Sequence, residues 1–142
     1  MTSPLATSRA AQALFLTALV LGTASALAQD VNVSLTGAEE VPAVTTAASG
    51  VGTIKISKDK SVSGSIKTTG IEGTAAHIHL GAPGQSGPAI ITLTKGSDGT
   101  WTVPPASKLT DDQYTSFKSG NLYVNVHSAE HKPGEIRAQL KP

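Results

Sequence analysis

The sequence predicts an all-β fold: an antiparallel Greek-key β-sandwich or barrel of about eight strands with one short helix. Apolar and polar residues alternate with a period of two in short segments. Gly, Pro, Asn and Ser separate these segments, as is typical of sandwiches and barrels. Helical periodicity is confined to one stretch that begins at Thr110. The two-sided alternation also predicts antiparallel strands with one face in contact with solvent.

Each expected strand is identified by the face that it would bury. Val31, Val33 and Leu35 share one face of the first strand, and the same spacing recurs along the chain. The segment 89–93 is more continuously apolar, so we expect it to be buried more deeply than the others. The expected strands cover residues 31–35, 53–56, 61–67, 76–80, 89–93, 101–103, 122–127 and 135–140.

One short helix is expected between Thr110 and Ser119. Thr110 and Gln113 have the spacing of a capping box, in which each side chain bonds the backbone N–H of the other residue. Gly120 suits the position directly after a helix, where the backbone turns left-handed. Tyr114 and Phe117 lie three residues apart and would dock the helix against the sheet.

The N-terminal residues 1–28 have the pattern of a secretory signal peptide. Arg9 supplies the positive charge, residues 10–21 supply the apolar region, and Ala-Leu-Ala precedes Gln29 as a cleavage site. The stretch is too short and too often interrupted by polar residues for a transmembrane helix. We therefore expect one mature domain over residues 29–142, periplasmic or secreted, with no membrane span after cleavage.

The composition excludes several classes of partner and ligand. The chain has 11 Lys and Arg against 10 Asp and Glu, and the signal peptide removes Arg9, so the mature domain carries no net formal charge. This balance argues against nucleic acid and against anionic membrane surfaces as partners. There is no cysteine, and the only methionine is Met1. Any metal would therefore be held by imidazole, carboxylate, amide or backbone oxygen, and a copper site would favour Cu(II).

The histidines suggest a metal site. In His77-Ile78-His79 the period of a strand places both imidazoles on one face, with Cα atoms about 6.6 Å apart. His127 lies on the outward face of a later strand, and His131 follows in a turn. Imidazoles at about 2.0–2.1 Å from one ion are typical of zinc and copper sites. We therefore expect His77, His79, His127 and His131 as ligands of a copper or zinc ion.

Other interpretations of these residues remain open. The histidines could instead lie on a solvated sheet face, hydrogen-bonded to neighbouring polar groups. If a metal is bound, Asn125, Glu135 and Arg137 are expected to orient the rings. The glycine-rich loop 81–88 precedes an apolar strand and not a helix, so it does not predict a phosphate site. No nucleophile motif or organic cofactor site is expected.

Four motifs together resemble the CHRD domain, a module named after chordin and common as a stand-alone secreted protein in microbes. They are Leu-Thr-Gly-Ala-Glu-Glu-Val-Pro at 35–42, Ala-His-Ile-His-Leu-Gly at 76–81, Gly-Asn-Leu-Tyr-Val-Asn-Val-His-Ser at 120–128 and Pro-Gly-Glu-Ile-Arg-Ala-Gln-Leu at 133–140. The chain departs from the family pattern at Ala138, where a glycine is usual. The resemblance spans nearly the whole mature chain.

The resemblance implies a β-sandwich or barrel of immunoglobulin-like or superoxide-dismutase-like kind and an extracytoplasmic location. More loosely, His77-Ile78-His79 with a late-strand histidine is similar to the copper ligands of copper/zinc superoxide dismutases. The loop 81–88 lacks that family's zinc ligands, and the chain cannot form its disulfide. Three hypotheses follow: a non-enzymatic metal-binding protein with copper ahead of zinc, a structural or protein-interaction module, and a copper-only dismutase-like enzyme.

Overall fold

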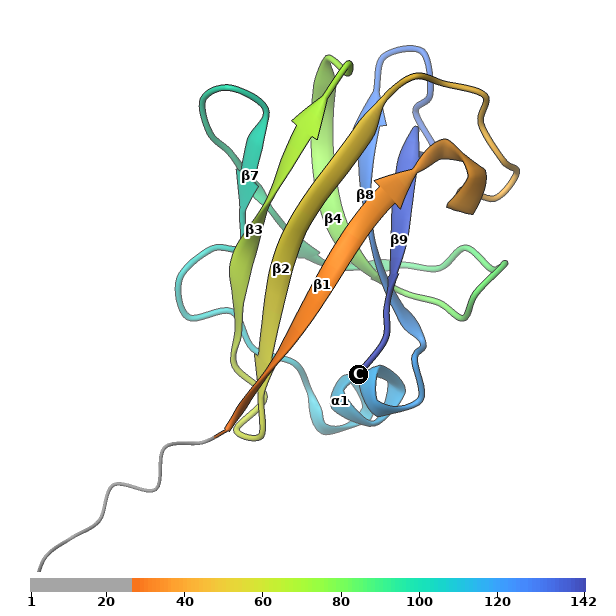
Figure 1. Cartoon of the computed structure of the whole chain (residues 1–142). Coiled ribbons are helices and arrows are strands. Elements are labelled where there is room, and N and C mark those ends of the chain that lie inside the picture. Colours follow the sequence, from red (N-terminus) through yellow and green to blue (C-terminus); the bar gives the residue numbers. More distant parts are fainter. Residues whose placement is uncertain (1–26) are drawn as a thin grey trace, which may run out of the picture.

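The structure of the chain is a computed structural model that describes residues 27–142. These residues form one antiparallel sheet of nine strands, curled into a nearly closed barrel, and one short α-helix (Figure 1). The sheet order is β5-β4-β8-β9-β1-β2-β3-β7-β6. The predicted all-β antiparallel fold with a single short helix is confirmed. The expected signal peptide lies outside the described residues, except for Leu27 and Ala28.

The strands fall close to the segments that the alternation predicts, with a short added strand after residue 93. The elements are β1 (Ala28–Thr36), η1 (Gly37–Glu39), β2 (Ser49–Ser57), β3 (Val62–Thr69), β4 (Gly73–Leu80), β5 (Ala89–Thr92), β6 (Thr94–Lys95), β7 (Thr100–Thr102), α1 (Asp111–Lys118), β8 (Leu122–Ser128) and β9 (Ile136–Leu140).

One continuous segment closes the barrel. β5 and β6 stand at the two ends of the sheet order but are separated in the chain by Leu93 alone. The Leu93 N–H donates to the Ala76 carbonyl at 2.9 Å, so the segment pairs with β4 at one end and with β7 at the other. The predicted deeper burial of residues 89–93 was wrong, because this connecting segment exposes Ala89 and Thr92 and buries only Ile91 and Leu93.

The barrel interior is the hydrophobic core. Alternate residues of β1 to β4, β8 and β9 fill it, and Leu35, Ile54, Ile78, Val124 and Ile136 have no exposed surface. The interior is therefore packed mainly with apolar side chains. Any functional site must lie on the outer face or at the ends.

The helix α1 lies at one end of the barrel, and the predicted capping box is present (Figure 1). The Thr110 hydroxyl accepts from the Gln113 N–H at 3.2 Å, and the Gln113 side chain accepts from the Thr110 N–H at 2.9 Å. Gly120 follows the helix with φ 74°, and Phe117 packs into the core at 1% exposure. None of the described helices is long and apolar enough to cross a membrane.

The prediction of a solvated outer face holds for β1 to β3 but was wrong for β8 and β9. In β8 the outward-facing Tyr123 and Asn125 are 3% and 1% exposed, and in β9 Arg137 is 1% exposed. The reason is that two connections fold over this face. The loop 81–88 is bonded to β9 from one side, and the segment 37–48 covers it from the other. The histidines therefore lie in a covered outer layer.

We predict that Thr110→Ala lowers the free energy of unfolding by about 1 kcal/mol, because it removes the oxygen that caps α1. Urea-induced unfolding followed by tryptophan fluorescence measures the change. Thr115→Ala, on the exposed face of the same helix, is the matched control and should leave stability close to that of the wild type. Equal stabilities of the two variants would contradict the role of the cap.

Candidate metal centre

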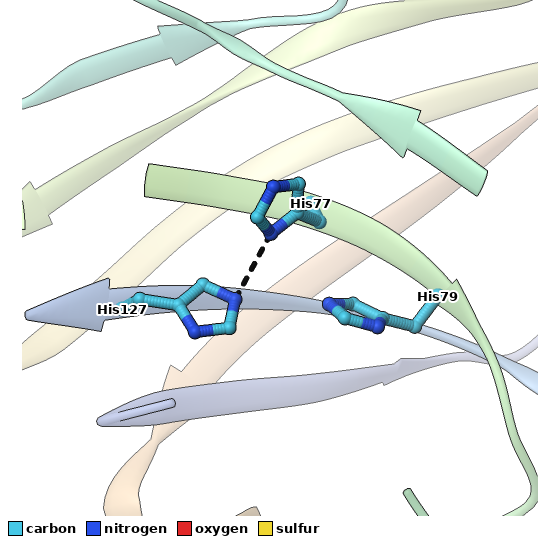
Figure 2. Close-up of side chains that lie close together, drawn as sticks. All are labelled: His77, His79 and His127. Atoms are coloured by element: carbon cyan, nitrogen blue, oxygen red, sulfur yellow. Dashed lines mark hydrogen bonds between the residues drawn. The ribbon is translucent and has the colours of Figure 1, made fainter. Parts of the chain in front are cut away.

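The three histidines of the candidate centre come from two neighbouring strands. His77 and His79 lie on β4, and His127 lies on β8 (Figure 2). In the antiparallel register Ala75 is opposite His127 and His77 is opposite Asn125, so His77 and His127 are diagonal neighbours. The two-residue period turns all three side chains to the outer face. The hypothesis that these histidines meet required β4 and β8 to be adjacent, and they are.

The ring nitrogens are close enough to share one ion. One nitrogen from each of His77, His79 and His127 lies within 4.8 Å of the other two. His77 Nδ1 is 3.0 Å from His127 Nε2 (Figure 2). Nitrogens that each lie about 2.0–2.1 Å from one ion are at most about 4.2 Å apart. Small ring rotations therefore bring the three donors into a common coordination sphere.

Backbone carbonyls fix the tautomers of two of the rings. His79 Nδ1 donates to the Gly87 carbonyl at 2.9 Å, and His127 Nδ1 donates to the Lys132 carbonyl at 2.7 Å. A carbonyl oxygen can only accept, so the proton of each neutral ring is on Nδ1 and the lone pair is on Nε2. Carbonyls that orient ligand imidazoles in this way are usual around metal ions. Both rings thus present Nε2 as the ligand atom.

The Nε2 atom of His79 is buried and has no hydrogen-bond partner. Buried polar atoms are nearly always paired, because an unpaired one costs about 1–3 kcal/mol of desolvation. A metal ion at the centre of the cluster would supply the missing partner. The donor set therefore fits a transition-metal ion, with Nε2 from His79 and His127 and Nδ1 from His77.

The third ring, His77, needs the opposite tautomer to act as a ligand. Because His127 Nε2 carries no proton, the 3.0 Å contact is a hydrogen bond donated by His77 Nδ1. Ligation through Nδ1 requires the proton of His77 to reside on Nε2 instead. His77 is only half-buried, so solvent can receive and return this proton.

The electrostatics of the cluster favour neutral rings. Burial lowers the pKa of His77, and the nearby charges of His127 and His79 lower it further. Burial also lowers the pKa of His79, although the hydrogen bond to Gly87 opposes this shift. A neutral imidazole is the form that binds metal, so protons compete less well for these two nitrogens than for ordinary histidines.

A stack of planar groups supports His79. The Tyr123 ring lies parallel to the His79 ring, with 3° between the planes and 4.7 Å between the centroids. The Arg137 guanidinium covers the other side of Tyr123, with Cζ 3.5 Å from its centroid. The Tyr123 hydroxyl accepts from the Gly87 N–H at 3.1 Å. His79 is thus held by its stacking partner and by the Gly87 carbonyl.

The expected orienting residues act differently from the prediction. His79 and His127 are oriented by the carbonyls of Gly87 and Lys132, and His77 contacts His127. Glu135 instead accepts from Thr46, and Arg137 bonds the loop 81–88. Backbone carbonyls carry no side-chain signature, so the sequence could not reveal them. The structure explains why position 87 is a glycine, since a Cβ atom there would overlap the carbonyl oxygen of Leu80.

The fourth expected ligand, His131, is not part of the group of three. It lies in the connection between β8 and β9, where its carbonyl accepts from the Gly134 N–H at 3.0 Å and its own N–H donates to Ser128 Oγ at 3.1 Å. The structure therefore brings three of the four expected ligands together. His131 shapes the turn whose Lys132 carbonyl orients His127.

The fold and the cluster define a β-barrel protein with a candidate three-histidine metal centre on its covered outer face. A family model described as the CHRD domain matches residues 31–140, so the chain belongs to the CHRD domain family. The match includes all three histidines and both connections that cover them. No curated protein and no solved structure matches the chain.

We predict that Gly87→Ala disrupts the hydrogen bond of His79. The added Cβ would overlap the Leu80 carbonyl, so the loop must shift and carry the Gly87 carbonyl away from Nδ1. The wild type should show a protected imidazole proton on His79 Nδ1 by nitrogen-edited NMR, and the variant should lose it. Ser86→Ala is the control, because Ser86 is an exposed residue of the same loop. A retained signal in Gly87→Ala would contradict this role of the loop.

Proposed function

We propose that this protein binds one divalent transition-metal ion through His77, His79 and His127, with copper preferred over zinc, and that it does so as a non-enzymatic protein of the periplasm or the extracellular space. The observation that carries the proposal is the buried, unpartnered Nε2 of His79 beside two further imidazole nitrogens. The fixed Nδ1–H tautomers of His79 and His127 support it, because they leave the Nε2 lone pairs free to bind an ion.

The solvated-face interpretation accounts less well for this arrangement. Histidines on a wet sheet face pair with water, whereas His79 is 9% exposed and its inner nitrogen lacks a partner. Three imidazoles in contact also repel one another when protonated, so the cluster is unfavourable unless the rings are neutral. An ion that accepts three lone pairs converts this unfavourable grouping into a stable one.

The donor set favours copper or zinc over other cations. All three donors are imidazole nitrogens, whereas calcium and magnesium prefer oxygen ligands. Divalent copper binds a given nitrogen site more tightly than zinc does in the general affinity order of these ions. The sequence offers no cysteine and no methionine beyond Met1, so soft ligands for Cu(I) are missing. We therefore place Cu(II) ahead of Zn(II).

The two alternative functions have less support. Among the described residues, the exposed large hydrophobic side chains are Leu27 and Val51, which gives a protein-interaction module little apolar surface to use. A copper-only dismutase-like enzyme has one favourable observation, since three protein ligands leave a coordination position open. Copper-loaded protein that consumes superoxide faster than the same amount of free copper would establish this activity.

We predict that the purified protein binds one equivalent of Cu(II), and that His79→Ala lowers its affinity by at least about 100-fold, since even outer partners of a metal site contribute 10- to 100-fold. Competition with a chelator of known affinity measures the change. His131→Ala is the matched control, since His131 lies outside the group of three, and it should bind as the wild type does. Electron paramagnetic resonance should show hyperfine splitting from three nitrogens in the wild type.

Equal and weak copper uptake by the wild type and by a His77→Ala/His79→Ala double variant would refute the metal site. A Zn(II) affinity above the Cu(II) affinity would leave the site but reverse the preferred ion. The double variant should retain its fold, which far-ultraviolet circular dichroism checks, because both residues lie on the outer face of β4 and not in the barrel core.

The proposed location has its own test. If residues 1–28 are a signal peptide, protein exported from a bacterial host should carry Gln29 at its N-terminus, which N-terminal sequencing or intact mass measures. A variant with Arg9→Glu, which reverses the charge of the n-region, should be exported less efficiently. Retention of residues 1–28 in protein from the envelope or medium would contradict cleavage at this site.

A further inference from the structure

A second buried polar atom borders the histidine cluster without a partner. In the described residues, two buried side-chain atoms lack a hydrogen bond: His79 Nε2 and Asn125 Oδ1. Asn125 is 1% exposed, so solvent does not satisfy its carbonyl oxygen. A buried unpaired amide oxygen carries a cost similar to that of the unpaired ring nitrogen. The two unsatisfied atoms therefore call for a common explanation.

The orientation of the Asn125 amide is fixed by its other end. Asn125 Nδ2 lies 3.4 Å from Glu40 Oε1 and 3.4 Å from the Pro133 carbonyl oxygen. The Pro133 carbonyl can only accept, so the amide atom facing it must be the nitrogen. Gly134 permits this approach, because a Cβ there would overlap both the Glu40 carboxyl and the amide. Asn125 Oδ1 must then point away from this turn.

The opposite side of the amide is the histidine cluster. Asn125 is the register partner of His77 across β4 and β8, and it lies two residues before His127 on the same face of β8. The register therefore places the Asn125 side chain beside the three rings on the covered face, with its nitrogen turned to the Pro133 carbonyl.

We propose that Asn125 is the oxygen-bearing member of the metal centre, and that its Oδ1 provides a weak fourth contact to the ion held by His77, His79 and His127. This inference rests on the proposed function. One bound ion would pair both unsatisfied atoms, His79 Nε2 and Asn125 Oδ1. The donor set would then be three nitrogens and one amide oxygen. A long, weak amide oxygen contact beside stronger ligands is known chemistry for Cu(II). Asn125 thereby tunes the ion's electronic environment.

The test compares Asn125→Ala and Asn125→Asp in the full chain loaded with Cu(II). Asn125→Ala should lower copper affinity about 10-fold and shift the paramagnetic resonance parameters, while the splitting from three nitrogens persists. Asn125→Asp keeps the shape of the side chain and an oxygen at the same position, so it should restore affinity at least to the wild-type value. Asn32→Ala, an exposed asparagine on β1, is the control and should change neither quantity.

The aspartate variant also guards against loss of fold. It keeps the size and shape of the buried Asn125 side chain, so it leaves no cavity at this position. If Asn125→Ala does not fold, the spectrum of Asn125→Asp decides alone: a charged oxygen at the ion must change it, and an unchanged spectrum overturns the inference.

The outcomes separate this inference from the proposed function. A wild-type protein that binds no copper refutes the metal site itself. A wild type that binds copper, with Asn125→Ala equal to it in affinity and spectrum, refutes only the role of Asn125 and indicates that a bridging water satisfies Oδ1. Reduced affinity in both variants with an unchanged spectrum indicates a purely structural side chain.

Discussion

The buried guanidinium of Arg137 holds the loop 81–88 against the outer face of the barrel. It donates to the Gln85 carbonyl at 2.8 Å, to the Ala82 carbonyl at 3.0 Å and to Gln139 Oε1 at 3.0 Å, so its charge is satisfied within the fold. Burying an arginine is costly unless such partners are present. The rest of the candidate site depends on this contact, because the loop that Arg137 holds carries the Gly87 carbonyl to His79.

The consequence is a polar layer outside a packed apolar barrel. The interior is filled mainly by apolar side chains, whereas on the covered outer face of β8 and β9 the Arg137 guanidinium contacts Tyr123, and Tyr123 stacks on His79. Covering this face removes water from the histidines, which lowers the pKa of His77 and His79 and leaves their nitrogens available to a metal ion. The barrel strands β4 and β8 position the three histidines, and the connections 37–48 and 81–88 shield the covered face from water.

The errors of the sequence predictions share one cause. Residues 89–93 and the outward positions of β8 and β9 were assigned from local hydrophobicity, which does not report what folds over a strand. Polar side chains such as Asn125 and Arg137 look solvent-facing in the alternation, yet both are 1% exposed because distant connections cover them. The orienting carbonyls of Gly87 and Lys132 could not be predicted, because every residue has a backbone carbonyl group and the sequence does not distinguish one from another.

The sequence by itself determined the features that depend on residues a few positions apart. The phase of each strand, the shared face of His77 and His79, and the capping box of Thr110 and Gln113 are local, since strand period and helix capping act over two to four residues. Only the tertiary structure decided that β4 pairs with β8, that His127 joins the cluster while His131 does not, and that the layer is buried. These outcomes depend on strand order and loop closure, which are set by the packing of the whole chain.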